Sequence, residues 1–525
     1  MFKKISDKME FPDWAGEGTR WRKLTIFDKL LDGTFYNHLK FAFYDEKTAG
    51  GDFIPLEGRR PSAQYKLPRY VSRQVSRKLF AGRHIPKVRA ESNEIEKKIS
   101  ALLTGTHIWP VMFEAAYRGS VGSVAVTFRV EDKKIGLKVW RAVWCSPIFD
   151  DFGDLLQLRI HYIAITNDLA ALGFKDLLPG RKYWFIRDYM MKQEVTYNPV
   201  LEDDWNPVHG FREPGASLVV ATVIDHNLGF VPAIWICNPG GVAAPDGAAL
   251  WEDAIPNSIE MDYLLSQASR GARYNCAPQL VTRGVILNEN SEGLTRTPVV
   301  HLAFAAAQKG EDGEMLGEGD AKLLEMTGAG AETALKLVEA LKKFALEQIG
   351  VVQKDLSEMP GPLSGRAMEY VDEDSHDTAM QWRNTYGEGG ALPLICKIIQ
   401  TLDKTIDVSK IWLQWPRIYQ PTPGDLINIV NALKVAVTPI AVEGAKASEG
   451  ESIPTVPPLL EGDIASAYLK ANLDLGILDD TVGTASPGPE DDIPNAAGGE
   501  KDGVMGANGP FWRVYPPIKV KQSNR

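Results

Sequence analysis

The sequence predicts an α+β fold assembled from several structural units. Its 525 residues exceed what one hydrophobic core usually organises. Short runs of β-branched and aromatic residues dominate the first 240 residues, whereas longer segments with helical spacing dominate the chain after residue 250. A hydrophobic fraction of 44% and a charged fraction of 24% are ordinary for a folded protein. These observations exclude a wholly disordered chain.

The first 240 residues are expected to form one α+β unit. Residues 93–103 have the spacing of a helix, and residues 123–130 alternate as a half-buried strand does. Asp150, Asp151 and Asp154 are interpreted as a strand turn rather than as a carboxylate pair for acid/base chemistry. Further strand-like runs occur at residues 136–144, 155–164, 181–189 and 216–224.

Two long helices are predicted to bracket a small β-rich insertion. Residues 251–276 and 331–349 each carry apolar side chains at three- and four-residue steps. Between them, residues 279–287 and 298–305 resemble short strands separated by polar, Gly-rich segments. Because both helices must return to the same body, the pattern predicts an antiparallel pair of rods that carries the insertion at its far end. Gly350 is expected to end the second rod.

The remaining chain is expected to be largely helical. Ser364 is interpreted as the cap of a helix that begins with residues 365–370 rather than as a nucleophile. Residues 391–406 place apolar side chains on one helical face. A strand is expected at residues 410–415. Two more helices are expected at residues 422–437 and 461–473, and residues 479–509 have the composition of a linker or tail.

The overall charge argues against a protein that coats DNA. Lys plus Arg number 58 and Asp plus Glu number 68, which gives a formal net charge of −10. The first residues lack the apolar region of a signal peptide, and no apolar run approaches the roughly 18 residues of a membrane span. We therefore expect a cytoplasmic product. The four cysteines are far apart and have no zinc-finger spacing, so neither a disulfide framework nor a zinc site is expected.

No catalytic signature is present. The chain has no phosphate-binding loop of the G-x-x-x-x-G-K-[ST] type, no G-x-S-x-G and no H-E-x-x-H, and its eight histidines are scattered. One acidic cluster, formed by Asp372, Asp374, His376 and Asp377, offers oxygen and imidazole ligands. Helical geometry favours a solvated face over a metal site, because residues i and i+2 do not face each other.

Several phrases, in their order along the chain, resemble the portal proteins of tailed bacteriophages. His226-Asn-Leu-Gly-Phe-Val-Pro232 and Trp235-Ile-Cys-Asn238 precede the first rod, and Gly361-Pro-Leu-Ser-Gly-Arg-Ala-Met368 follows the second. The basic phrase Tyr70-Val-Ser-Arg-Gln-Val-Ser-Arg-Lys-Leu-Phe80 is similar to the segment before the first wing strands of that family. The resemblance spans roughly residues 65–475.

The resemblance implies how the family's parts divide this chain. It implies a wing (1–249), a first stem helix (250–276), a clip (277–327) and a second stem helix (328–350). Residues 351–440 would hold the tunnel loop, a long helix and the return to the wing, and residues 441–525 the crown and an extended tail.

The resemblance also implies a ring. The position of each residue in the family's parts gives the candidates for its sites. DNA-channel candidates are Lys336, Lys342, Lys343 and Lys354, and tunnel-loop candidates are Gln353, Asp355, Ser357, Glu358 and Met359. Candidates for docking through the clip are Arg283, Glu289 and Arg296. The implied protein has no catalytic site, no metal and no cofactor.

The implied partners are those of a portal vertex. They are further copies of the chain in a dodecameric ring, double-stranded DNA, the terminase large subunit, a head-to-tail adaptor, and the major capsid and scaffolding proteins. The implied location is the virion, with assembly in the host cytoplasm and no membrane. Two alternatives remain open: a metal-dependent enzyme acting on nucleic acid, and another head-to-tail connector component.

A basic segment stands apart from the acidic average of the chain. Ten Lys or Arg residues and no Asp or Glu lie between Arg59 and Arg89. This composition is compatible with binding phosphates. A solvated or subunit-facing helix surface is the favoured interpretation.

Overall fold

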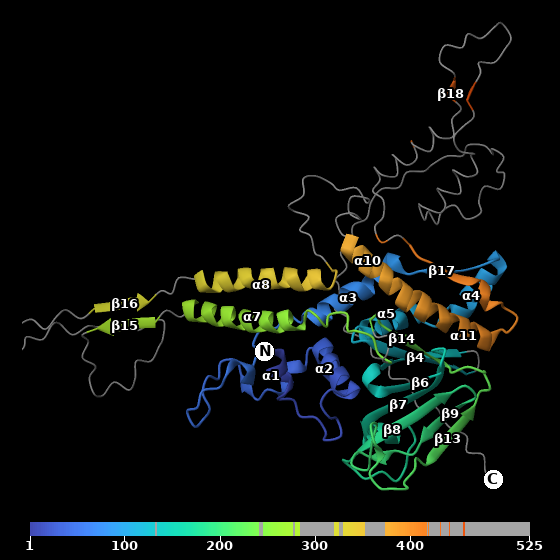
Figure 1. Cartoon of the computed structure of the whole chain (residues 1–525), viewed down its shortest axis with the longest axis horizontal. Coiled ribbons are helices and arrows are strands. Elements are labelled where there is room, and N and C mark those ends of the chain that lie inside the picture. The colour runs from blue at the N-terminus through green and yellow to red at the C-terminus, as the bar shows by residue number, and fades with distance from the viewer. Residues whose placement is uncertain are drawn as a thin grey trace, which may run out of the picture. The chain divides into compact units, whose positions relative to one another are not determined.

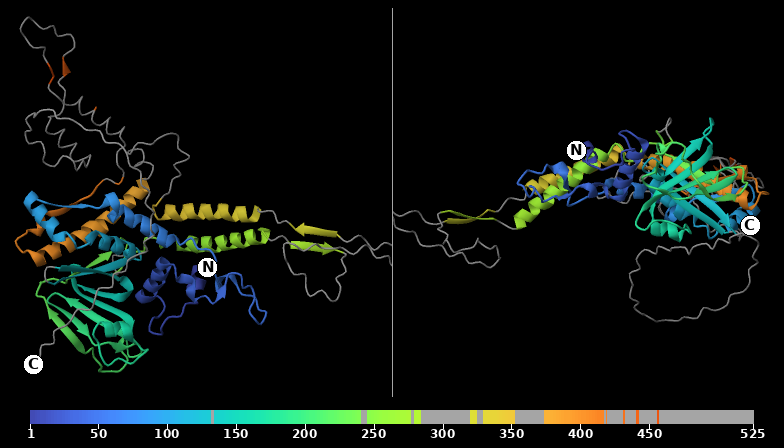
Figure 2. Two further views of the ribbon diagram at one scale, coloured as in Figure 1. Left: turned by 180° about the vertical axis from the view of Figure 1, so that it is seen from behind. Right: turned by 90° about the horizontal axis from the view of Figure 1, so that it is seen from below.

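The computed structural model describes most of the chain and divides it into two compact units. The described residues are 1–131, 134–240, 245–276, 279–283, 320–324, 329–351, 373–416, 418, 431, 440–441 and 455–456. The first unit comprises Met1–Leu158, Phe230–Leu356 and Asp372–Leu413, and the second contains Arg159–Gly229. Both units combine helices with strands, which confirms the α+β class (Figures 1 and 2).

The main sheet of the first unit is antiparallel and has the strand order β14-β4-β5. Val124, Ala125 and Val126 of β4 are buried, because this strand is covered on both sides of the pleat. Its register with β14 pairs Val126 with Ile234. The strands of the sheet are β4 (Ser123–Glu131), β5 (Lys134–Arg141) and β14 (Ala233–Cys237).

Smaller strand pairs and one edge strand complete the β-structure of this unit. They are β1 (Phe41–Ala42) with β2 (Arg59–Arg60), β3 (Lys87–Ala90) with β17 (Ile411–Gln414), β15 (Gln279–Arg283) with β16 (Asp320–Leu324), and β6 (Cys145–Phe149).

Helices of the first unit pack on this sheet and on one another. Helix α5 contacts β4 and β5, and α11 contacts β14. Thr19 caps α2 by accepting from the Arg22 N–H, and Gly33 ends it in the left-handed conformation. The helices are α1 (Phe2–Ser6), α2 (Arg20–Asp32), α3 (Leu67–Phe80), α4 (Asn93–Leu103), α5 (Ile108–Gly119), α7 (Ile255–Cys276), α8 (Ala329–Gln348), α10 (Glu373–Trp382) and α11 (Leu392–Leu402).

A π-helix, Arg383–Ala391, joins α10 to α11. Here the buried side chain of Asn238 donates from Nδ2 to Gly119 O and Ala248 O, both at 3.0 Å. Its Oδ1 accepts from the Tyr386 hydroxyl at 2.9 Å. A Cβ atom at Gly119 would collide with that hydroxyl, so the close approach requires glycine. Asn238 therefore connects α5, the segment before α7 and the π-helix.

Helices α7 and α8 lie side by side and antiparallel (Figures 1 and 2). Asn257 near the start of α7 donates to Gln348 at the end of α8 (3.0 Å). At their other ends the chain continues into β15 and β16, which pair antiparallel with Gln279 opposite Leu324. Gly350, with φ +69°, ends α8, as the sequence predicts.

The second unit is built on an antiparallel sheet that includes the order β13-β9-β8-β7, with β10 also pairing β8. The Asp188 carboxylate is buried and accepts two hydrogen bonds from Arg159, each 2.7 Å long. Ala164, Leu169 and Phe185 pack in its core. The elements are β7 (Leu155–Ile165), α6 (Thr166–Ala171), β8 (Lys182–Met190), β9 (Gln193–Tyr197), β10 (Val200–Leu201), β11 (Trp205–Asn206), β12 (Gly210–Phe211) and β13 (Val220–Asp225).

Outside these elements, β18 (Ile440–Ala441) pairs with β19 (Thr455–Val456). No helix in the part of the chain that the structure describes is long and apolar enough to cross a membrane.

Several sequence-based boundaries were wrong. The first rod, expected from residue 251, begins at Ile255, and the strand expected from residue 216 begins at Val220. The strand expected at residues 136–144 ends at Arg141, and a 3-10 turn follows. At this turn the Arg20 guanidinium donates hydrogen bonds to the carbonyls of Ala142 and Cys145. The helix expected to reach residue 406 ends at Leu402, because the Asp403 side chain accepts from the Thr405 N–H and turns the chain. The strand expected at residues 298–305 and the helices expected at 365–370, 422–437 and 461–473 lie outside the described residues, apart from single position 431.

Replacing Asn238 with Ala is expected to lower the thermal midpoint of the protein strongly. The change leaves the buried carbonyl of Gly119, the carbonyl of Ala248 and the Tyr386 hydroxyl without their amide partner. Each such group costs about 1–3 kcal/mol. Asn384→Ala, which alters an exposed amide on the same π-helix, is the matched control. Equal midpoints for the two variants, measured by differential scanning calorimetry, would contradict this role of Asn238.

Candidate functional site

The candidate site is the pair α7 and α8, where the sequence places the DNA-channel lysines. The first half of α7 has one buried face, on which Ile259, Met261 and Tyr263 are each at most 2% exposed. Along α8 the residues that are buried, among them Val338, Ala345 and Leu346, recur at helical spacing. Among the described helices, α7 makes the most extensive contact with α8.

The N-terminal segment, residues 36–65, holds α7 through buried polar contacts. The Tyr36 hydroxyl donates to Asp262 Oδ2 (2.8 Å), and the Tyr65 N–H donates to Asp262 Oδ1 (2.6 Å). One turn later, Ser266 Oγ accepts from the Ala63 N–H (3.1 Å). The Tyr263 hydroxyl donates to the Arg59 carbonyl (2.8 Å). These bonds fix α7 against the N-terminal segment.

Burial determines the protonation of Asp262. Removal of this carboxyl from water raises its pKa to about 6, although the hydrogen bonds from the Tyr65 N–H and the Tyr36 hydroxyl act in the opposite direction. The same burial, together with the neighbouring carboxylate, raises the pKa of Tyr36, so this phenol stays protonated and donates. The sequence reasoning missed Asp262, and an acidic residue flanked by Met261 and Tyr263 in an apolar helix was the available signal.

The structure separates the three described channel lysines. Lys336 and Lys343 are exposed and lie two turns apart on one face of α8. Lys336 forms an ion pair with Glu332 (2.8 Å). Lys342 lies about 100° further round the helix, where its ammonium is 5.7 Å from the centre of the Tyr65 ring. One face of α8 therefore presents Lys336 and Lys343, and Lys342 packs on the N-terminal segment.

Exposed apolar side chains accompany these lysines. Leu337 and Phe344 are 47% and 57% exposed and, seven residues apart, share one flank of α8. Leu335, also 47% exposed, lies on the other flank. A helix with exposed apolar residues on both flanks has surface available for a further protein contact.

The structure describes no side chain for the other site candidates. Lys354, the tunnel-loop candidates Gln353, Asp355, Ser357, Glu358 and Met359, and the docking candidates Glu289 and Arg296 lie outside the described residues. Arg283 is the last residue of β15, and only its backbone is described.

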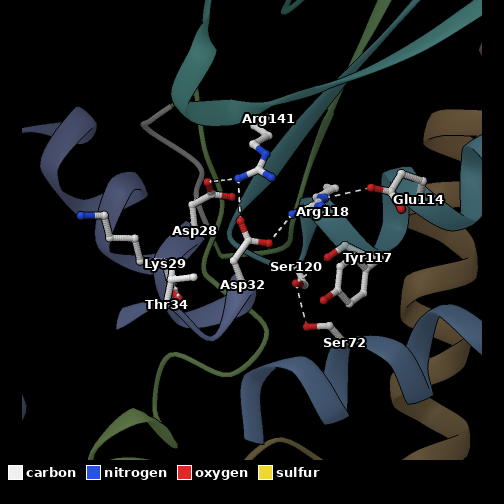
Figure 3. Close-up of polar contacts among 10 residues, drawn as sticks. All are labelled: Asp28, Lys29, Asp32, Thr34, Ser72, Glu114, Tyr117, Arg118, Ser120 and Arg141. Carbon is white, nitrogen blue, oxygen red and sulfur yellow. Dashed lines mark hydrogen bonds and ion pairs between the residues drawn. The ribbon is translucent and has the colours of Figure 1, made fainter. Parts of the chain in front are cut away.

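A charged network attaches α2 to the body of the first unit (Figure 3). Arg141 Nη1 lies 2.5 Å from Asp28 Oδ2 and 2.7 Å from Asp32 Oδ2, and Arg118 reaches Asp32 and Glu114 at 2.6 and 2.9 Å. Burial raises the pKa of Asp28. It would also raise the pKa of Asp32, but hydrogen bonds and charge from both arginines outweigh burial and lower it. These arginines are occupied internally, so the network has a structural role.

The acidic clusters do not form a metal site among the described residues. No group of three metal-ligating side chains occurs there. His376 Nδ1 lies 3.6 Å from the exposed carboxylate of Asp377, whereas the side chains of Asp372 and Asp374 are outside the described set. The Asp150 carboxylate accepts from the Phe152 and Asp154 N–H groups, which confirms its interpretation as a turn. Ser364 is also outside the described residues.

The described thiols are protonated at neutral pH. Burial raises the pKa of Cys145 and of Cys237, and it raises the pKa of Cys396 to about 11. A thiolate nucleophile would need the opposite shift.

A comparison with models of protein families gives no match for this chain, and a comparison with curated proteins gives none either.

Replacing Asp262 with Asn is expected to change the pH dependence of stability. The folded-state pKa of about 6 exceeds the ordinary aspartate pKa of 3.8, so the folded protein binds the extra proton between these pH values. The stability that this proton adds to the folded protein is present below pH 4 and is lost as the pH rises through 6. At about 1.4 kcal/mol per pKa unit, the wild type should lose about 3 kcal/mol relative to Asp262→Asn between pH 4 and 7.

Urea unfolding followed by circular dichroism at several pH values measures this difference. Asp253→Asn, which changes an exposed carboxyl just before α7, supplies the baseline for removing one acidic group. Parallel stability profiles for wild type and Asp262→Asn would contradict the assignment.

Proposed function

We propose that this chain is the subunit of a portal ring of a tailed bacteriophage, the channel through which double-stranded DNA enters and leaves the capsid. The observation that supports this most is the antiparallel pair α7 and α8, joined at one end to the paired strands β15 and β16. The sequence predicts the same order of a helix, a β-rich insertion and a second helix. The sequence phrases that resemble portal proteins flank these elements. In the proposal the helices are the stem and the insertion is the clip.

The surface of α8 supports assembly with further copies. Leu335, Leu337 and Phe344 are exposed in the single chain, and burial of apolar area is the main driving force for association. A closed ring needs two different complementary faces on each subunit. In the proposed ring, the two flanks of the helix pair supply parts of these two faces.

The charge of the chain suits passage rather than retention of DNA. A net charge of −10 repels phosphates, and Lys336 is partly neutralised by Glu332. A lumen of this kind would hold DNA only weakly at each position. In the proposal Lys336 and Lys343 are the channel candidates that remain accessible on α8, and Lys342 has a packing role.

The proposed partners follow from the ring. The terminase large subunit would dock on the clip, where Arg283, Glu289 and Arg296 are candidates, and a head-to-tail adaptor would later use the same end. Capsid and scaffolding proteins would surround the ring in the virion. The ring itself performs no catalysis in this proposal, and the energy for DNA movement comes from the terminase ATPase.

Native mass spectrometry with negative-stain electron microscopy is expected to show a closed ring of about a dozen subunits. The double variant Leu337→Glu/Phe344→Glu should shift the protein to monomers or small oligomers, because it places charge in the proposed interface. Phe152→Glu changes a side chain that is 94% exposed in a turn elsewhere and should keep the ring. A wild-type monomer at micromolar concentration would refute the proposal.

A divalent-ion-dependent nuclease assay separates this function from the alternative enzyme. The portal proposal predicts no cleavage of DNA. Cleavage that disappears in Asp374→Ala would support the enzyme instead.

A further inference from the structure

The strongest unassigned feature of the first unit is the exposed face of α3. Arg69, Arg73 and Arg77 are all exposed and follow one another at four-residue intervals, so they form one row along the helix. At 1.5 Å per residue, neighbouring arginines are about 6 Å apart along the axis and the row is about 12 Å long. No ion pair or hydrogen bond of these three side chains occurs within the described part of the chain.

The opposite face of α3 explains why the row points outward. Val71, Val75 and Leu79 are at most 3% exposed, and Ser72 and Ser76 are buried with hydroxyls bonded to the preceding turn. The helix therefore has a single orientation on the body of the first unit. The arginine row is a fixed property of the folded surface.

The residues between the arginines are also polar. Lys66, Tyr70 and Gln74 are half-buried and adjoin the row, and no aliphatic side chain lies on this face. A stable protein–protein interface has an apolar centre, which this face lacks. Arginine, with its planar fork of donors, is suited to phosphate oxygens. No acidic residue lies between Arg59 and Arg89 to compete for the guanidinium groups.

We propose that the α3 arginine row, Arg69, Arg73 and Arg77, binds the backbone phosphates of double-stranded DNA. Each strand of the duplex presents one phosphate per about 3.4 Å of axis, so a row of about 12 Å faces three to four phosphates. Contacts to backbone phosphates carry no sequence information, so binding through this row is independent of sequence. This surface acts on duplex lying against the body of the subunit, and it does not depend on the ring or on the lysines of α8.

The test measures the salt dependence of binding to a 30-base-pair duplex by fluorescence anisotropy. Each neutralised phosphate contributes about 0.9 to the slope of log K against log salt. For Arg69→Gln/Arg73→Gln/Arg77→Gln, the slope should therefore fall by about 2.7 or more, with weaker binding at every salt concentration. Arg69→Lys/Arg73→Lys/Arg77→Lys retains the charges and should retain most of the slope.

The matched control is Lys97→Gln/Lys98→Gln/Lys134→Gln, which removes three exposed positive charges from α4 and β5. It should keep the wild-type slope. An equal loss in the control and in the arginine variant would refute the proposal, since only net charge would then matter. An unchanged slope in the arginine variant would also refute it.

The oligomeric state of each variant, measured by native mass spectrometry, separates this inference from the proposed ring. If the arginine variant binds DNA normally but loses its assembly, the row contacts an acidic face of another copy and the proposal is wrong. If it assembles normally and loses the slope, the proposal stands. A wild-type chain that forms no ring but binds duplex through α3 would overturn only the portal proposal.

Discussion

The arrangement of the first unit depends on one buried amide. Asn238 uses both N–H donors and its carbonyl oxygen on three separate segments, namely the end of α5, the segment before α7 and the π-helix. Asn238 is only 4% exposed, and a buried amide is tolerated only when its hydrogen bonds are made. Each of the three segments must therefore stay in position for the amide to keep all of its hydrogen bonds. Gly119 and Gly390 permit this because side chains there would collide with Tyr386 and Ile236.

The rod formed by α7 and α8 takes its direction from this centre. Ala248, bonded to Asn238, lies seven residues before the start of α7, and Trp251 between them is fully buried. The polar contacts of Asp262 and Ser266 then fix α7 against the N-terminal segment. A rod fixed along one side and open on the flanks of α8 presents its exposed apolar residues in a constant geometry. Assembly into a ring would require this, because small angular errors accumulate around a closed circle.

Charge is distributed unevenly over the molecule. Arg118 and Arg141 are paired with the carboxylates of α2, and Lys336 is paired with Glu332, so these cations are compensated within the chain. The arginines of α3 differ, since their face contains no acid from residues 59–89. An acidic protein can therefore offer one local surface to phosphates while its other surfaces repel them.

Local patterning in the sequence determined the strands β4, β7 and β8 and the long helices α7 and α8, because alternation and three- to four-residue spacing reflect which face is buried. Helix α2 carried the cap residues Thr19 and Gly33, and α5 carried apolar residues at helical spacing, so local patterning could have predicted both. The strand β16 and the π-helix could not have been found, since the first exists through its pairing with β15 and the second through its fit against Asn238 and Gly119. The sequence likewise showed that the lysines of α8 and the arginines of α3 were present. Only the tertiary structure decided which of them reach solvent, because Lys342 packs on Tyr65, a residue 277 positions away, and no local pattern encodes so distant a contact.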